Sequence, residues 1–137
     1  EEINSLVIYS KSDRYTIMNA DKIHNESFYT KLDIRNLSEL LESVSSYGSI
    51  NIDKLGNLFT SVNISSDHSP VTITTTDENT FYTDITVIQA DLKYAEKLRT
   101  SLTRTNPDNE IRLSGSIGNN PGSVIRVKAV SANVNLK

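Results

Sequence analysis

The chain has 137 residues, and its 14 Lys and Arg against 17 Asp and Glu give a formal net charge of −3. This length suits one domain of ordinary size. The absence of Cys excludes disulfide frameworks, thiolate zinc sites and cysteine nucleophiles, and no apolar run approaches the roughly 18 residues that a membrane-spanning helix needs. Ser, Thr and Asn make up 45 residues, which predicts a small core with many short strands and turns.

Charge is unevenly distributed along the chain. Residues 1–92 carry a net charge of −8 and residues 93–137 a net charge of +5. This asymmetry indicates either solvent-exposed charges without a specific role or an anionic partner that faces the C-terminal part. The hydroxyl- and amide-rich composition favours an extracytoplasmic bacterial protein, and the chain opens on Glu1 without a targeting segment. We therefore expect a processed protein that is secreted or periplasmic.

Two short apolar runs lie near the start of the chain. Residues 6–9 and 15–18 are separated by the polar sequence Lys11-Ser12-Asp13-Arg14, which predicts a hairpin with a polar turn. We expect residues 1–35 to form an N-terminal hairpin arm, and residues 36–137 to form the main domain.

A short helix is predicted after the arm. Asn36 followed by Glu39 is a capping-box pattern, and Gly48 suits the C-terminal cap of a helix that ends near Tyr47. Apolar side chains at helical spacing lie between them, namely Leu37, Leu40, Leu41 and Val44.

Beyond residue 50 the apolar period changes to two. Alternating residues predict strands over residues 58–64, 71–75 and 81–87. A turn at residues 65–70 and a three-residue hairpin loop at Asp77-Glu78-Asn79 separate these strands.

A second helix is predicted over residues 91–105. Asp91 suits its N-cap, and Asn106-Pro107 ends it because the α region is disfavoured before Pro. Its apolar stripe consists of Leu92, Ala95, Leu98 and Leu102. Strands over residues 111–117 and 124–134 follow, and the changing inward phase of the last one predicts a β-bulge near Ala129-Val130.

This order of elements predicts the fold class. Three strands, a helix and two strands follow residue 50, which is the order of the OB-fold barrel; a generic α+β sandwich is the alternative. We predict an α+β, mostly β fold: an OB-like five-stranded barrel with one helix between strands three and four, preceded by an N-terminal hairpin and a short helix.

Candidate catalytic groups are few. His24 and His68 lie in polar segments, and Asp77-Glu78 is placed at a loop tip, where two carboxyl groups are too well solvated for acid–base chemistry. No phosphate-binding glycine motif is present. We expect no enzymatic activity, no cofactor and no metal site.

A basic strip is the first candidate binding feature. Arg126 and Lys128 are two residues apart on one predicted strand and so share a face, and Arg112 is expected beside them on the preceding strand. OB-folds that bind single-stranded nucleic acid combine such a strip with exposed aromatic side chains, for which Phe59 and Tyr82 are the candidates. Ordinary surface cations are the plainer interpretation.

Several local strings resemble one family. Their order along the chain resembles that of cholera and heat-labile enterotoxin B subunits. The strings are Leu-Ser-Glu-Leu-Leu at residues 37–41, the predicted strand at 50–55, the predicted hairpin at 71–74 and 80–81, the predicted helix around 95–98, and the loop Asn119-Asn120-Pro121-Gly122-Ser123. The resemblance covers residues 36–137. It implies an OB-fold, a secreted, ring-forming and non-enzymatic subunit, and binding to cell-surface glycans.

The resemblance also implies a sugar site. Asp84, Gln89 and Asn120 match the family's sugar-binding positions, and carboxylate and amide groups suit sugar hydroxyls. The chain lacks the family's Cys pair, and the family's sugar-stacking Trp falls at Gly118.

We therefore expect a non-catalytic extracytoplasmic binding module, of the glycan-binding, toxin-B-like or adhesion type, with a cell-surface glycan or protein as partner and a homo-oligomer as one expected state. The first alternative is an OB-fold protein that binds single-stranded nucleic acid through Arg112, Arg126 and Lys128. The second is a structural pilus or secretion-system component whose polar strands pair with a neighbour at an edge.

Overall fold

The computed structural model describes residues 2–56, 59–76, 79–98, 102–106, 109–118 and 122–137. Within them the chain is almost entirely β-strand, with a 3-10 helix, η1 (Glu96–Leu98), and no helix long and apolar enough to cross a membrane. The strands are β1 (Glu2–Lys11), β2 (Arg14–Phe28), β3 (Lys31–Ser46), β4 (Ser49–Ile52), β5 (Ser61–Asp67), β6 (Val71–Ile73), β7 (Phe81–Ile88), β8 (Leu92–Tyr94), β9 (Leu102–Thr105), β10 (Glu110–Ile117), β11 (Val124–Val130) and β12 (Val134–Leu136).

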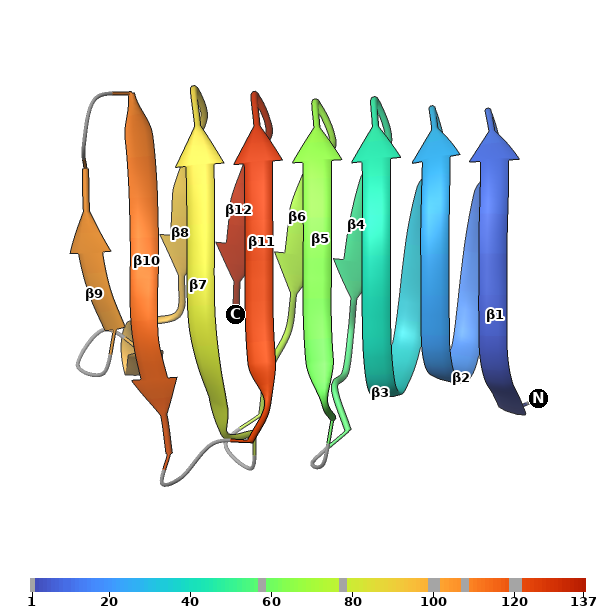
Figure 1. The fold of residues 1–137 in the computed structure, drawn as a ribbon, viewed down its shortest axis with the longest axis horizontal. Coiled ribbons are helices and arrows are strands. Elements are labelled where there is room, and N and C mark those ends of the chain that lie inside the picture. The colour runs from blue at the N-terminus through green and yellow to red at the C-terminus, as the bar shows by residue number, and fades with distance from the viewer. Residues whose placement is uncertain (1, 57–58, 77–78, 99–101, 107–108, 119–121) are drawn as a thin grey trace.

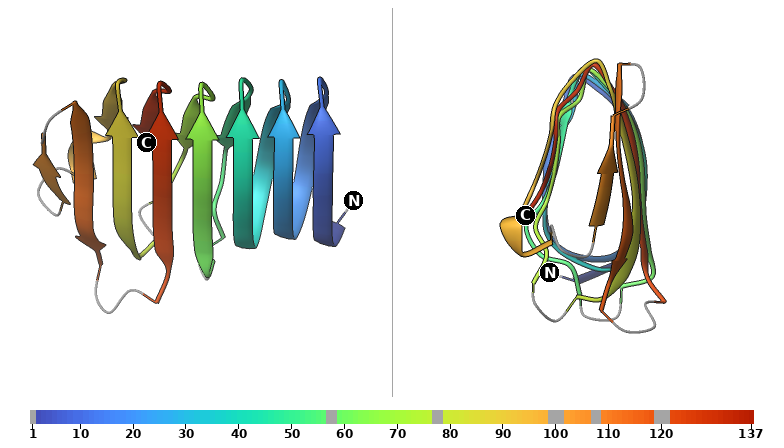
Figure 2. Two further views of the ribbon diagram at one scale, coloured as in Figure 1. Left: turned by 45° about the horizontal axis from the view of Figure 1, so that its top comes forward. Right: turned by 90° about the vertical axis from the view of Figure 1, so that its left-hand side faces the viewer.

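The strands form one curled, mixed sheet that closes into two layers around a narrow core (Figures 1 and 2). The front layer of Figure 1 runs β1, β2, β3, β5, β11, β7, β10 and β9; the rear layer contains β4, β6, β12 and β8. β2 and β3 are long enough to contribute to both layers. Their first residues pair with each other in the rear layer, Arg14 with Lys31, and their last residues pair in the front layer, Phe28 with Ser46. The chain therefore winds in flattened coils, with parallel pairing from coil to coil.

One coil is out of chain order. β11 pairs in parallel with β5 on one side and β7 on the other, and β12 pairs in parallel with β6 and β8. Residues 124–136 therefore fill a slot between two coils that precede them in the sequence. After β8 the direction changes, because β10 pairs antiparallel with β7 and β9 antiparallel with β10.

Six short turns connect a front strand to the following rear strand, and we refer to them as the arches. Each arch begins with a non-glycine residue at a positive φ of 51–65°. These residues are Ser12, Tyr29, Tyr47, His68, Gln89 and Ser131. Their backbone N–H groups donate to the next coil, as Tyr29 does to Ser46 and Tyr47 to Asp67, both at 2.9 Å. The repeated left-handed residue turns the chain from one layer to the other while keeping the coils in register.

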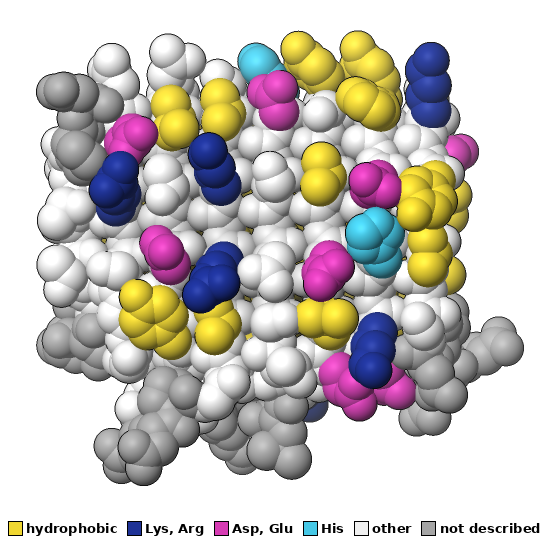
Figure 3. Space-filling view, in the orientation of Figure 1, with side chains coloured by type: hydrophobic (Ala, Val, Ile, Leu, Met, Phe, Trp, Pro, Cys, Tyr) yellow, Lys and Arg dark blue, Asp and Glu magenta, His cyan; other side chains and the backbone are white. Residues whose placement is uncertain are grey.

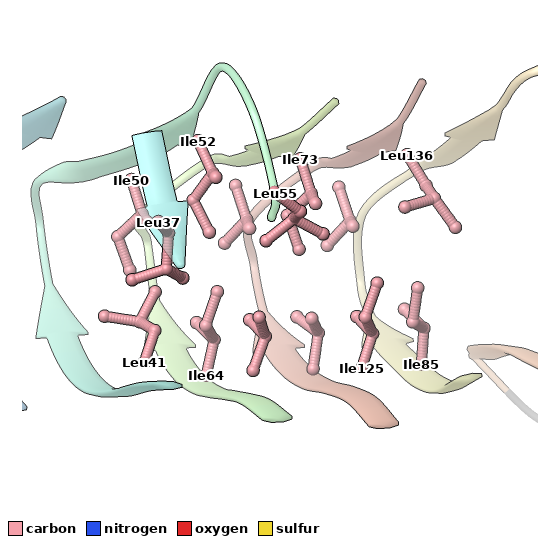
Figure 4. Packing of buried hydrophobic residues seen from close by; sticks show 14 of the residues in the cluster. Leu37, Leu41, Ile50, Ile52, Leu55, Ile64, Ile73, Ile85, Ile125 and Leu136 are labelled. Atoms are coloured by element: carbon pink, nitrogen blue, oxygen red, sulfur yellow. The ribbon is translucent and has the colours of Figure 1, made fainter. Parts of the chain in front are cut away.

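The core lies between the two layers and is built from apolar rows that run from coil to coil. Ile17 pairs with Ile34, Ile34 with Ile52, and Ile52 with Ile73, and all four are at most 5% exposed. Figure 4 shows side chains of the front strands pointing towards those of the rear strands. Because burying one such side chain contributes about 1.5–3 kcal/mol, these rows are the main stabilising feature of the fold.

The predicted fold class is confirmed only in its coarse part. The chain is mostly β, as expected, and its curled sheet is barrel-like in the end view (Figure 2, right). The OB-like five-stranded barrel with a helix between strands three and four is wrong, because twelve strands form the sheet and parallel pairing dominates it.

Both predicted helices are wrong. Residues 36–46 belong to β3, and the Tyr47-Gly48 pair forms an arch. Leu37 and Leu41 are buried, as predicted, but the pairing of β2 with β3 shifts register between Ala20 and Lys22, so an extra residue produces the four-residue spacing. Of residues 91–105, the described part forms β8, η1 and β9.

The predicted hairpins are also wrong, although their turns are in the expected places. β1 and the start of β2 are joined at residues 12–13, but β1 pairs in parallel with residues 19–28. The turn at residues 68–70 connects β5 to β6, which pairs with β4 and β12. The loop predicted at 77–79 lies largely outside the described residues. The bulge predicted near Ala129-Val130 is instead the arch at Ser131, which moves the chain from β11 to β12.

A candidate binding groove on the front layer

The front layer carries a shallow groove of about 550 Å³ across β2, β3, β5, β11 and β7. Side chains at matching heights on these strands form its rows. One row runs His24, Glu42, Asn63, Arg126 and Asp84, each paired in register with the next. Because successive residues of a strand point to opposite faces, every member of the row faces solvent while its neighbours face the core.

The second row of the groove lies nearer the arches. It contains Val44, Ser65, Lys128 and Thr86, again in register. Figure 3 shows that basic and acidic side chains are interspersed over this face rather than separated into two fields. A ligand on the groove therefore meets hydrogen-bond donors and acceptors at short intervals.

Four groove side chains have unused hydrogen-bonding capacity. Within the part of the chain that the structure describes, the side chains of Asn63, Asp84, Arg126 and Lys128 form no hydrogen bond or ion pair with one another or with other side chains. This holds even though Arg126 is the register partner of both Asn63 and Asp84. The centre of the groove thus presents amide, carboxylate and cationic groups that are available to a ligand.

The N-terminal end of the groove is more engaged. His24 Nε2 lies 3.4 Å from Glu26 Oε2, and His24 Nδ1 lies 3.6 Å from Glu42 Oε2. The ring of Tyr9, on β1, is 6.0 Å from the His24 ring at an interplanar angle of 59°, and Tyr9 is 70% exposed. An aromatic surface therefore borders the polar floor.

Below this end, the core is locally polar. Asn25 is fully buried and its amide nitrogen donates to Ser43 Oγ at 2.9 Å and to Ser27 Oγ at 3.2 Å. Its Oδ1 atom is buried without a partner. These contacts hold β2 to β3 beneath the groove and fix the height of His24 and Glu42.

A row of exposed rings lies along the arches. The Tyr29 and Tyr47 rings stack with centroids 5.4 Å apart, and the Tyr47 and His68 rings stack at 4.7 Å. His68 Nδ1 lies 2.6 Å from Asp67 Oδ1. The rings align because they occupy the same left-handed position in successive arches.

The sugar-site residues implied by the family resemblance are separated in the structure. Asp84 lies in the groove on β7. Gln89 is exposed and begins the arch after β7, outside the groove lining. Asn120 lies outside the described residues.

The predicted basic strip is only partly brought together. Arg126 and Lys128 share the front face and both line the groove. Arg112 faces the same side but lies on β10, which β7 separates from β11, and its guanidinium is 3.0 Å from Glu110. Of the two aromatic candidates, Phe59 is buried in the core and Tyr82 is 40% exposed.

Sequence reasoning missed the other half of the groove. The sequence predicts a helix that contains Glu42 and a polar segment around His24, and it indicates no role for Asn63. The signal that could have found them is a repeat of 17, 18 and 21 residues between Ile17, Ile34, Ile52 and Ile73. Repeats of this length are typical of coiled β architectures.

No family model, curated protein or solved structure matches the chain. Among the described residues, no three His, Asp or Glu side chains are grouped so that they could hold a metal ion. In architecture the described chain is a stack of flattened β-coils that presents a shallow polar groove on its front layer.

Proposed function

We propose that the protein is a non-catalytic binding module, acting outside the cytoplasm, and that the groove of the front layer holds a stretch of a glycan chain. The observation that carries the proposal is the set of unpaired side chains at the groove centre, Asn63, Asp84, Arg126 and Lys128. Sugars present a dense array of hydroxyl groups that both donate and accept. Amide and carboxylate oxygens accept from them, while amide, guanidinium and ammonium groups donate.

The shape and border of the groove support the same class of ligand. The groove is open and lies across five parallel-paired strands, so an extended chain can lie along it without entering a closed cavity. The exposed Tyr9 ring beside His24 supplies an aromatic face, whose negative quadrupole suits the C–H groups of a sugar ring. This aromatic face takes the place of the Trp that the sequence lacks.

The charge pattern favours a glycan over single-stranded nucleic acid. Asp84 borders Arg126, and Glu110 neutralises Arg112, so the cations do not form a continuous track. Nucleic-acid binding of the non-specific kind depends on several cations that contact phosphates together, which makes it fall steeply with salt.

The test is retention on a printed array of oligosaccharides, with matched asparagine variants. Asn63→Ala removes a half-buried amide of the groove, whereas Asn135→Ala removes a half-buried amide on rear strand β12. We expect the unmodified chain to bind the array and to stay bound at high salt. Asn63→Ala should lower the affinity by about fivefold to a hundredfold, which corresponds to roughly 1–3 kcal/mol for a buried hydrogen-bonding group left unpaired. Asn135→Ala should leave the affinity unchanged.

Two results would count against the proposal. One is an array without signal for the unmodified chain. The other is equal loss from the two asparagine variants, which would place binding elsewhere. Affinity for single-stranded oligonucleotides that disappears as salt rises, with loss on Arg126→Ala, would support the nucleic-acid alternative instead.

A further inference from the structure

The centre of the groove contains two basic side chains on one strand. Arg126 and Lys128 are exposed and lie two residues apart on β11, so both project from the front face, with their Cα atoms about 6.6 Å apart. β11 lies between β5 and β7, which places these residues inside the front layer rather than at its border. We refer to Arg126 and Lys128 as the cation pair. Their long side chains can reach a single small anion placed between them.

The cation pair has no carboxylate partner, unlike cations on other strands of the sheet. Lys22 Nζ lies 3.7 Å from Glu39 Oε2, and Arg112 Nη2 lies 3.0 Å from Glu110 Oε2. Among the described residues, no acidic side chain makes such a contact with either member of the pair. Two like charges this close repel each other, so an anion bound between them lowers the electrostatic energy.

The neighbours of the cation pair favour one position for the anion. Arg126 lies beside Asp84 in register, and Asp84 repels a second negative charge there. Lys128 instead lies between Ser65 and Thr86, whose hydroxyl groups can donate hydrogen bonds. An anion on the Lys128 side of the pair therefore has two cations and two hydroxyl donors around it.

The rest of the protein does not attract anions in general. The formal net charge is −3, and Glu42 and Asp84 lie in the same row of the groove as Arg126. A polymer with a negative charge on every unit therefore meets repulsion on both sides of the cation pair. The groove suits single negative charges that are separated by neutral units.

We propose that the groove binds an acidic glycan in which neutral sugar units separate the acidic ones, and that the cation pair binds the carboxylate of one acidic unit. This inference rests on the proposed function, since it concerns the ligand of the same groove. The two oxygens of a carboxylate lie in one plane, so one accepts from Arg126 and the other from Lys128 along the same strand. Such charge-assisted hydrogen bonds are about twice as strong as neutral ones. Asn63 and Asp84, on the flanking strands, then bind hydroxyl groups of the neighbouring neutral units.

The test compares oligosaccharides that differ in charge by calorimetric titration. Hyaluronan oligosaccharides alternate a carboxylate sugar with a neutral one, their carboxyl-reduced form keeps the chain without the charge, and oligogalacturonate carries a carboxylate on every unit. We expect hyaluronan to bind most tightly, with an affinity about tenfold to a hundredfold above that of its reduced form, as hydrogen bonds to a charged group contribute. Because the pair binds a single negative charge, added salt should weaken this binding only modestly.

Two lysine variants test where the carboxylate binds. Lys128→Gln removes one charge of the cation pair, whereas Lys93→Gln removes the same charge from an exposed lysine of rear strand β8. We expect Lys128→Gln to weaken the binding of hyaluronan by about tenfold and to leave the binding of the reduced form unchanged. Lys93→Gln should change neither. Both lysines are exposed, so neither substitution should alter folding.

The outcomes separate this inference from the proposed function. An affinity for hyaluronan no greater than that for its reduced form, tighter binding of oligogalacturonate, or equal losses from the two lysine variants would overturn the inference and leave glycan binding in place. Tighter binding of chondroitin sulfate than of unsulfated chondroitin would overturn the assignment of the carboxylate. If no oligosaccharide binds, neutral or acidic, the proposed function fails and the inference fails with it.

Discussion

Gly48 offers a sharp test of how closely successive arches approach. A Cβ atom at this position would lie 2.9 Å from both the carbonyl carbon and the amide nitrogen of Thr30, and closer still to the carbonyl oxygen. Thr30 is fully buried, and its carbonyl accepts a hydrogen bond from the Ser49 N–H at 3.1 Å. Gly48→Ala therefore forces two coils apart at a point where backbone meets backbone.

The magnitude follows from these contacts. Overpacking of a tight site costs about 1–3 kcal/mol, and losing the Ser49–Thr30 hydrogen bond adds about 0.5–1.5 kcal/mol. Against this, the alanine removes about 0.4–1 kcal/mol of unfolded-state freedom. We expect Gly48→Ala to lower the free energy of unfolding by about 0.5–4 kcal/mol, measured by urea denaturation.

Gly122→Ala is the matched control, because nothing lies within 4 Å of its added Cβ atom. We expect it to be neutral or to stabilise the protein by up to about 1 kcal/mol. Equal urea midpoints for the two variants would refute the close approach of the arches.

Two further predictions test the arches and the strand assignment of residues 36–46. Ser131→Gly replaces a non-glycine residue in the left-handed conformation, φ 52°, and should raise the thermal midpoint of unfolding. The left-handed conformation costs an L-residue about 1–2 kcal/mol, and the greater conformational freedom of glycine in the unfolded chain offsets part of this gain. A clear fall in the midpoint would contradict the arch geometry. Leu41→Ala should lower the free energy of unfolding by about 2–5 kcal/mol, since Leu41 is fully buried, whereas Val44→Ala should change it by less than about 0.5 kcal/mol because Val44 is exposed. Similar losses for both in chemical denaturation would instead favour the helical spacing in which Leu41 and Val44 share one face.

Local signals in the sequence located the turns better than the pairing. The polar segment around Ser12-Asp13, the residues before Pro70 and the phase change near Ala129 all mark real arches. A polar turn between two apolar runs has the same sequence pattern in a hairpin and in an arch. The two differ only in whether the second strand pairs with the first or continues in the opposite layer. That choice depends on pairing with distant coils, as in the contact of β4 with β6, which no local pattern reports.

The false helices have a physical cause. Where a strand bends from the rear layer to the front layer, an added residue changes which side chains point inward, so Leu37 and Leu41 are both buried at a spacing of four. Short apolar segments of this kind cannot be assigned by period alone. The strand pattern predicts the basic pair Arg126 and Lys128, and the family resemblance implies Asp84. Their common groove depends on β11 lying beside β7, which sequence order does not indicate.

The placement of residues 124–136 has a consequence for the order in which the molecule is assembled. β5 and β7 each pair with β11 along its length, yet β11 is synthesised after both. Until β11 has been synthesised, the edges of β5 and β7 with which it pairs have no partner strand. β11 begins more than 30 residues after Ile88, the last residue of β7. Such non-local closure is slow and leaves edges exposed to misassembly. Residues 124–136 are therefore synthesised after both of the coils that they join, and the sheet is continuous from β5 to β7 only when β11 is in place.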